Sequence, residues 1–570
     1  MDRGRVERLV PGVGAIRGYQ RAWLRSDVVA GVAVVALAIP AGMGYATAAG
    51  LPPVTGLYAT IVPLLAYAVF GPSRVLVLGP DSSLAPMIAA AVLPLALGSA
   101  DRAVALAGML ALLMGVMLIA GRVLRLGFVT GLLSQPIRVG YLNGVALVVI
   151  VSQLPTLLGL SVPGGSLWER LEQTAQGIAD GAANGLAAGI GLGSLVVMVL
   201  ARVVRSKVPG IVLAVVGSMT VTAVLGLADD LPVVGVLPQG LPAPALTGIQ
   251  PSDVLALLGP ALGIALIAFA DTGVLSRTLA GRHGYSVDGN QEMGALGVAN
   301  AASGLLGGFP VSGSASRTPV AVQAGARSQL VGVVAAVLLV VFMLLAPGLP
   351  AYLPSSTLAA VVIAAATSFV DVSTPVRLAR MSRTETALLV TAFLGVAFIG
   401  VLEGIVVAIG LSLLAFVRQA WDPYRTELVN VDGVPGYHDV SRHPEGHRIP
   451  GLVIARFDAP LFFANGDVFD SYIRELVENA PTPVRWVIVA AEPITGVDTT
   501  ALGELIELDD HLARHGISLV FAEMKGPVKD RLVRFGMRSR FGPDHFFPTV
   551  NGAVKAYRRE MGHRDGRGQL

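Results

Sequence analysis

The sequence predicts a polytopic α-helical membrane protein followed by a soluble α/β domain, and three observations support this fold class. Apolar residues make up 54% of the 570 residues. Only 14% are charged, against about 25% in an ordinary soluble protein. The composition then changes towards the C-terminus, because 21 of the 38 acidic residues lie from Trp421 onward. We therefore expect a transmembrane domain at 27–418 and a soluble region after it.

Fourteen apolar segments of the transmembrane domain are candidate spans. A helix needs about 20 apolar residues to cross a bilayer, and a broken helix needs fewer. Seven candidates fall in a first half, about 27–227, and seven in a second half, about 252–418. They lie near 28–48, 54–70, 82–98, 103–120, 128–154, 183–203, 209–227, 253–280, 293–308, 314–326, 329–346, 354–370, 384–400 and 402–418.

Basic residues follow every even-numbered span, whereas the loops after odd-numbered spans carry mainly acidic residues. Short cytoplasmic loops are enriched in Lys and Arg, so this bias predicts cytoplasmic N- and C-termini and a multi-pass protein of the inner or plasma membrane. The Arg-rich segment 1–26 is predicted to be a cytoplasmic tail and not a signal peptide. The basic residues of the even-numbered exits are Arg74, Arg122, Arg125, Arg202, Arg205, Lys207, Arg282, Arg327, Arg377, Arg380, Arg383 and Arg418.

The segment Gly259–Gln329 carries the strongest functional signal. Asp271 lies near the middle of an apolar helix, and the stretch GGFPVSGSASR places Arg317 at the start of a new helix after a Gly-Pro interruption. Ionisable groups at membrane depth are costly and mark ion or substrate paths. Free backbone N–H groups, the positive end of a helix dipole and a guanidinium would meet at this break. We therefore expect an anion site there.

The two halves carry matching interruptions. Span 1 is broken at IPAGMGYATAAG and span 3 begins at VLGPDSSLAPM, while seven spans later span 8 carries Asp271 and span 10 begins at GGFPVSGSASR. Paired interruptions in corresponding positions of two halves indicate the binding site of a transporter. An odd number of spans per half makes the repeats inverted, so the starts of spans 3 and 10 would face each other near the midplane. The alternative is that Gly and Pro are simply common in membrane helices.

The C-terminal region alternates between strands and helices from 441 to 562. LVIARFDAP, VRWVIVAA and ISLVFAE are predicted strands, and helical segments separate them. This alternation predicts a small α/β domain. We expect a linker at 419–440 and a disordered tail at 563–570. Asp498 is a good N-cap for the helix that begins at Thr499 and Thr500.

Four stretches of this sequence resemble the SulP (sulfate permease) family of anion transporters. They are IPAGMGYATAAGLPPVTGLYATIVP, GPDSSLAPM, NQEMGALGVANAASGLLGGFPVSGSASRTPVAVQAGARSQL and VDTTALGEL. The match covers nearly the whole chain, with its motifs in the right order. The resemblance implies fourteen spans in two inverted repeats of seven, divided into core and gate domains. It also implies a C-terminal STAS domain, a homodimer and an elevator-type movement of the core.

The same resemblance assigns roles to individual residues. The anion would lie between the starts of spans 3 and 10, beside span 1. Asp271, with Asp81 as a second candidate, would handle a coupling H⁺ or Na⁺. Many relatives have Gln where this chain has Ala41, and Glu where it has Asp271, which affects the substrate and coupling ion more than the fold. The implied substrate-binding residues are Tyr45, Asp81, Ser82, Ser314, Ala315, Ser316 and Arg317.

Several of these residues have structural alternatives. Arg317 would be a structural group if it paired with Asp271 or Asp81. Asp81 would be a helix cap, whereas as a site residue it would compete with the anion unless it were protonated, which would couple proton uptake to anion entry. Tyr45 would only pack against its neighbours, and the serines would only cap a helix.

The pair Thr499–Thr500, which follows Asp498, aligns with the phosphorylatable position of anti-sigma-factor antagonists, so these three residues are regulatory candidates. The alternative is simple capping by Asp498, with both threonines facing solvent.

We expect a secondary transporter of inorganic oxyanions, with sulfate as the first candidate and bicarbonate next, coupled to H⁺ or Na⁺. The alternatives are a dicarboxylate or nucleobase carrier on the same fold, and a sensor or scaffold whose active part is the soluble domain. The arginine of GSASR favours an anion, because a neutral base needs no cation. The chain has no cysteine, phosphate-binding loop or nucleophile with its base, so we expect no enzyme, metal centre or cofactor. Without clustered basic faces, we expect no nucleic-acid partner.

Overall fold

The computed structural model describes residues 10–127, 134–162, 167–206, 208–238, 240–241, 243–244 and 246–565. Residues 1–9 of the predicted N-terminal tail, 128–133 of the fifth predicted span, Lys207 and residues 566–570 of the predicted C-terminal tail lie outside the described residues. The chain divides into two compact units, Met1–Ser412 and Leu413–Leu570.

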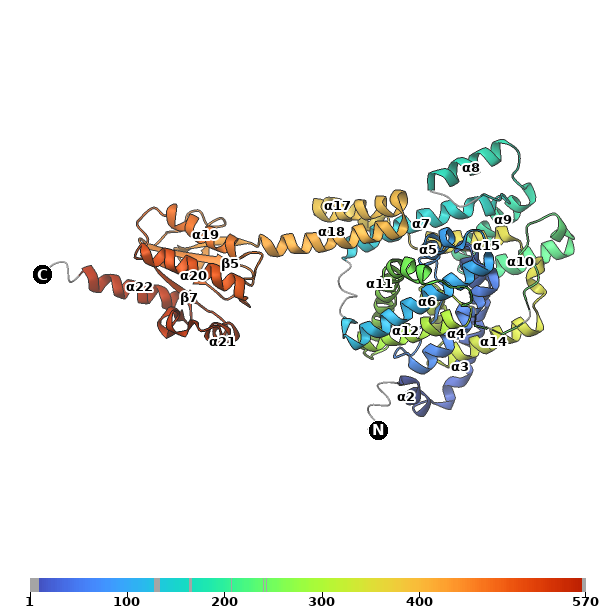
Figure 1. Ribbon diagram of the computed structural model, residues 1–570, viewed down its shortest axis with the longest axis horizontal. Helices are drawn as coiled ribbons and strands as arrows, with labels where there is room; N and C mark the ends of the chain where they lie inside the picture. The colour runs from blue at the N-terminus through green and yellow to red at the C-terminus, as the bar shows by residue number, and fades with distance from the viewer. Residues whose placement is uncertain are drawn as a thin grey trace. The chain divides into compact units, whose positions relative to one another are not determined.

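The first unit is built mainly of helices (Figure 1), with one two-stranded sheet. Its short turns are η1 (Arg21–Trp23), η3 (Leu227–Asp229), η4 (Leu349–Tyr352) and the π-helical turn η5 (Gly395–Ile399). Helix α18 runs across the division between the units. The helices are α2 (Pro11–Arg17), α3 (Leu24–Ala48), α4 (Pro53–Phe70), α5 (Ala85–Ala96), α6 (Ala100–Val123), α7 (Gln135–Leu157), α8 (Leu167–Ala179), α9 (Gly185–Val203), α10 (Gly210–Val224), α11 (Pro251–Arg282), α12 (Gly289–Leu305), α13 (Arg317–Gln323), α14 (Leu330–Leu345), α15 (Ser355–Thr367), α16 (Ser373–Met381), α17 (Arg383–Leu394) and α18 (Val401–Trp421).

A helix overlaps each of the fourteen predicted spans, but not all of these helices are long. Among the described residues, six segments are long and apolar enough to cross a membrane: Arg21–Ala48, Pro53–Phe70, Ala100–Val123, Gln135–Leu157, Gly185–Val203 and Pro251–Arg282. Shorter apolar helices include α5, α10, α14 and α15. The helical membrane region is therefore confirmed, whereas the number of spans and their inverted repetition stay predictions.

Two segments that the sequence reading treated as loops are helices. They are α8, after the fifth predicted span, and α16, after the twelfth. Each has an apolar stripe and a polar face, so neither contains the continuous apolar run by which a span is recognised.

The helices of the first unit pack in two groups. In one, α12 lies along α6 and α4, and α14 lies along α3 and α4; Figure 1 shows α6 and α12 side by side. In the other, α7 packs against α15 and α17, and α9 packs against α10 and α15. Small residues allow the close approach of α6 and α12, since a Cβ on Gly304 would lie 2.2 Å from the carbonyl oxygen of Gly108.

The second unit is an α/β domain with a six-stranded sheet of order β4-β3-β5-β6-β7-β8. Strands β5 to β8 run parallel, and β3 and β4 are antiparallel additions. The strands are β3 (Arg425–Val431), β4 (Val434–Asp439), β5 (Leu452–Phe457), β6 (Trp486–Ala490), β7 (Ser518–Ala522) and β8 (Phe546–Phe547). The helices and turns are α19 (Gly466–Glu478), α20 (Thr499–Arg514), α21 (Gly526–Arg534), η6 (Met537–Ser539), η7 (Pro543–His545) and α22 (Val550–Asp565).

Helices cover both faces of this sheet, as a parallel sheet requires. One core includes Phe469 of α19 and Leu505 of α20, and the other includes Val554 and Tyr557 of α22. Strands β3 and β4 lie within the segment 419–440, which the sequence predicted as a linker, and both join the sheet. The alternating burial of β3 allows it to pair with β5 and complete the sheet edge.

Candidate functional site

The starts of the third and tenth predicted spans meet through a short antiparallel ladder. Strand β1 (Leu78–Gly79) pairs with β2 (Ser312–Gly313), in the register Leu78 opposite Gly313 and Gly79 opposite Ser312. The backbone N–H of Ser314 adds a hydrogen bond of 2.9 Å to the carbonyl of Val77. The chain leaves this ladder into α5 on one side and α13 on the other. The two interruptions predicted to face each other are therefore adjacent.

Arg317 is the charged group at this junction, and its side chain is fully buried. Its Nε donates to Ser314 Oγ at 2.9 Å, and its Nη2 donates to the carbonyl of Pro80. Its Nη1 has no hydrogen-bond partner among the residues that the structure describes. A buried cationic donor without an acceptor is costly, so this nitrogen is a position where an anion would be stabilised.

Glycine at position 79 makes room for the guanidinium. A Cβ there would lie 2.7 Å from Arg317 Nη1, and the φ of 152° is one that side chains rarely adopt. None of the hydrogen bonds of Arg317 goes to a carboxylate. Among the described residues, the structural ion pair with Asp81 or Asp271 is therefore not formed.

Asp81 makes the local hydrogen bonds expected of a cap. Its Oδ1 accepts from the backbone N–H of Ser83 at 3.0 Å and from Ser83 Oγ at 2.9 Å. Its carbonyl accepts from Leu84 and Ala85 at the start of α5. The carboxylate is also within electrostatic range of Arg317. Asp81 thus combines a structural role with a place beside the guanidinium.

The remaining predicted binding residues lie around the same point. Tyr45 of α3 is buried, and its hydroxyl interacts with the hydroxyls of Ser82 and Ser316. Ser314 Oγ lies 3.2 Å from Ser316 Oγ. Ala315 and Ser316 are exposed, although Arg317 beside them is buried. The structure therefore gathers hydroxyls and a cation beside an accessible stretch of backbone.

Asp271 lines a small cavity between α7, α11 and α18. The cavity, of about 10 Å³, is also lined by Arg138, Tyr141 and Ala408; such a volume is near the minimum for one water. Asp271 interacts electrostatically with Asp81 and Arg138. The next residue, Thr272, ties α11 to the ladder, because its Oγ1 accepts from the N–H of Gly313 at 2.8 Å. Asp271 and the ladder are therefore mechanically connected.

The sequence reading missed a buried acid and a buried amide on α12. Glu292 accepts from Tyr67 Oη at 2.5 Å and from Ser276 Oγ at 2.7 Å. Asn300 binds the backbone of Val311 just before β2, accepting from its N–H at 2.8 Å and donating to its carbonyl at 3.1 Å. Both residues lie in the NQEM…VAN stretch, where polar groups inside an apolar helix were the available signal.

In the soluble domain, Asp498 acts as the predicted cap of α20. Its Oδ1 accepts from the N–H of Ala501 at 2.8 Å, and its Oδ2 accepts from the N–H of Phe463 at 2.8 Å. Thr499 and Thr500 are exposed. This arrangement matches the capping alternative, and a regulatory role stays a prediction.

Comparisons with known proteins agree along nearly the whole chain. The profile of the "Sulfate permease family" matches residues 24–392, and that of the "STAS domain" matches residues 443–553. A "Probable sulfate transporter" of Mycobacterium tuberculosis is 40% identical over 550 residues, which cover 96% of this chain and 98% of that protein. "Sulfate transporter 4.1, chloroplastic" of Arabidopsis thaliana is 28% identical, covering 96% of this chain and 82% of the relative.

Solved structures show the same fold. The murine Slc26a9 anion transporter in the inward-facing state superposes with a TM-score of 0.91 at 23% identity, covering 98% of this chain and 95% of that one. The transmembrane domain of the cyanobacterial bicarbonate transporter BicA gives a TM-score of 0.60 at 22% identity, covering 70% of this chain and 98% of that one.

Proposed function

Because the chain belongs to the sulfate permease family and carries a STAS domain, we propose that it is a secondary transporter of inorganic oxyanions whose substrate is sulfate. It is a membrane transporter of a small anion and not an enzyme. The sulfate assignment rests on the relatives named above, of which the mycobacterial protein matches over almost its full length.

One observation supports the anion site above all others, namely the unpartnered Nη1 of the buried Arg317. A sulfate oxygen placed against Nη1 would complete the hydrogen bonding of the guanidinium. The hydroxyls of Ser82, Ser314 and Ser316 would donate to the other oxygens. Charge-assisted hydrogen bonds of this kind are about twice as strong as neutral ones, and a guanidinium is planar and always charged.

An elevator-type movement is the proposed mechanism, with one helix group carrying the site past the other. The group of α3–α6 and α11–α14 would move, and the group of α7, α9, α10, α15 and α17 would stay. The antiparallel pairing of β1 with β2 supports inverted repeats, because two elements related by a twofold axis in the membrane plane run in opposite directions. The homodimer and the cytoplasmic termini remain part of the proposal.

The proposed coupling step uses Asp271. A carboxyl in this small cavity would bind H⁺ or Na⁺, and Thr272 would transmit the change to β2 through Gly313. Coupling requires that the ion favour one arrangement of the ladder over another, since a ligand shifts an equilibrium only by its differential affinity.

Transport in proteoliposomes tests the proposal. Radiolabelled sulfate and bicarbonate uptake would be measured with and without a Na⁺ gradient and with and without a pH gradient. We expect concentrative sulfate uptake driven by one of the two gradients. Uptake of bicarbonate without uptake of sulfate would show that the substrate is bicarbonate and that the sulfate assignment is wrong. Sulfate uptake that is unaffected by both gradients would show that transport is not coupled to H⁺ or Na⁺.

A further inference from the structure

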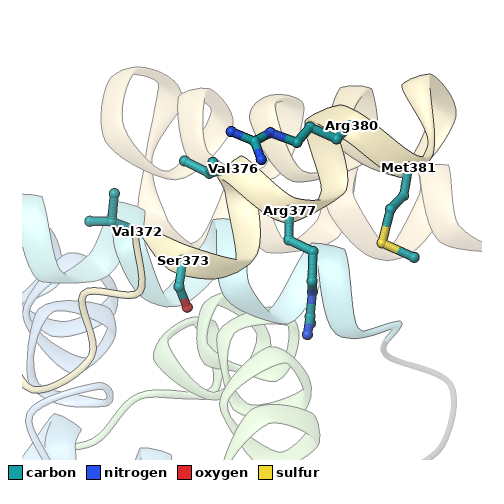
Figure 2. Close-up of a pocket in the computed structure, with 6 residues that line it drawn as sticks. All are labelled: Val372, Ser373, Val376, Arg377, Arg380 and Met381. Carbon is teal, nitrogen blue, oxygen red and sulfur yellow. The ribbon is translucent and has the colours of Figure 1, made fainter.

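A second charged surface lies on α16, far along the chain from the anion site. The exposed residues of this helix form a shallow hollow of about 620 Å³, lined by Val372, Ser373, Val376, Arg377, Arg380 and Met381. Figure 2 shows Arg377 and Arg380 leaving α16 in different directions, with the Val376 side chain next to the Arg380 guanidinium. Thr374 and Leu378 form the buried stripe of the helix. The outer face of α16 is therefore apolar and basic at once.

The apolar residues on this face are strongly exposed. The exposed fractions are 68% for Val372, 50% for Val376 and 74% for Met381. Neither Arg377 nor Arg380 takes part in a salt bridge among the described residues. Water is a poor environment for these exposed apolar side chains, and hydrocarbon is a poor environment for the two arginines. The boundary between headgroups and acyl chains satisfies both, because apolar side chains insert there while arginines reach the phosphates.

The position of α16 in the chain places it at this boundary. It follows the apolar helix α15 after only five residues and is followed by α17 after one. Its start is held firmly, because the Asp371 carboxylate accepts from Ser373 and Thr374, including Thr374 Oγ1 at 2.6 Å. The backbone of Asp371 also exchanges two hydrogen bonds with Asn143 of α7, at 2.8 and 2.9 Å. The surface is thus fixed against a membrane helix and ordered before any ligand arrives.

We propose that the outer face of α16 is a binding site for anionic phospholipid, with Arg380 on the headgroup phosphate, Arg377 adding positive charge on the same helix, and Val372, Val376 and Met381 against the acyl chains. Charge complementarity selects the occupant, since a zwitterionic lipid offers no net negative charge to two unpaired guanidinium groups. Each basic residue near an anionic membrane surface adds to binding, and salt screens the attraction. The lipid site does not involve the transported anion, so the test of this site is independent of the test of the proposed function.

Native mass spectrometry of the full chain, released from nanodiscs of phosphatidylcholine with or without phosphatidylglycerol, measures which lipid is retained. We expect the wild-type chain to retain phosphatidylglycerol preferentially, and the retention to fall as salt is raised. Arg377→Gln/Arg380→Gln should weaken it roughly thirtyfold. Arg377→Lys/Arg380→Lys should keep most of it, because the charge remains. The matched control is Arg534→Gln/Arg538→Gln, which removes two exposed arginines of the STAS domain, outside the predicted spans, and should leave lipid retention unchanged.

Three results would overturn the site: equal retention of both lipids by the wild-type chain, unchanged retention by the double Gln variant, or an equal loss in the control. Should the double Gln variant fail to fold, the salt dependence of the wild-type chain decides, because salt-independent retention contradicts an electrostatic site. Retention that inorganic phosphate abolishes at equal ionic strength would indicate a free-phosphate site and also refute the lipid assignment.

Discussion

At the scale of single residues, Arg317 gives the sharpest prediction. Arg317→Gln removes the cation beside Gly79 and should weaken sulfate binding by about 2 kcal/mol or more, which is about thirtyfold. Arg317→Lys keeps the charge without the planar donor pair, so its sulfate affinity should lie between those of the wild type and Arg317→Gln. Sulfate affinity of the purified protein, from isothermal titration, is the measurement. Arg327→Gln is the matched control, because the Arg327 side chain is exposed in the same segment. Equal affinity in Arg317→Gln and wild type would remove Arg317 from the site.

Asp439 gives a pH prediction in the STAS domain. The hydroxyl of Thr426 donates to its Oδ1 at 2.6 Å, Tyr424 Oη donates to its Oδ2, and these bonds hold its pKa below the ordinary value of 3.8. Since the folded pKa is depressed, the stabilisation is complete above pH 3.8 and is lost as the pH falls below it. Protection factors from hydrogen exchange in β3 and β4 should drop as the pH is lowered from about 4 to about 2.

The Asp439→Asn variant should lack this pH dependence, whereas Asp432→Asn, in the exposed turn of the same hairpin, should keep it. If wild-type protection were constant through that range, the carboxylate would have no part in holding the hairpin.

At the scale of elements, the contact between α6 and α12 depends on residues without side chains. A Cβ at Gly304 would lie 2.2 Å from the backbone of Gly108 and 2.8 Å from that of Leu112. Gly304→Val should therefore push the helices apart and cost about 1–3 kcal/mol. The thermal midpoint in detergent should fall. Gly193→Val is the control, since no atom of the described residues lies within 4 Å of the position of its Cβ. A variant as stable as wild type would contradict this close packing.

The elements also show what the sequence could and could not provide. Long apolar runs and Gly-Pro interruptions identified the membrane helices and the meeting of β1 with β2. The amphipathic helix α16 was missed because Arg377 and Arg380 separate its few apolar residues along the sequence, so that the segment resembles an ordinary basic loop. Strand β3 was missed because its partner β5 follows in the sequence only after β4 and a further loop. The room that Gly79 leaves for Arg317 depends on two distant segments meeting, which no local pattern encodes.

At the scale of the whole molecule, an elevator requires the two helix groups to slide, and α3 and α15 are in contact across them. A Cβ on Gly44 of α3 would lie 3.0 Å from Cγ2 of Val362 on α15, so a cysteine pair there falls within disulfide reach. The chain has no cysteine, which leaves the introduced pair as the sole one. Oxidised Gly44→Cys/Val362→Cys should stop sulfate uptake in proteoliposomes, and a reductant should restore it.

The control for this experiment joins two helices of the same group. A Cβ on Gly42 of α3 would lie 3.4 Å from Oγ1 of Thr60 on α4, within disulfide reach. Oxidised Gly42→Cys/Thr60→Cys should continue to transport because both helices move together. Blocked uptake in the first pair only would locate the sliding surface between α3 and α15. Full uptake through a completely formed Gly44–Val362 crosslink would show that these two groups do not move past each other, and alternating access would then need a gate within one group.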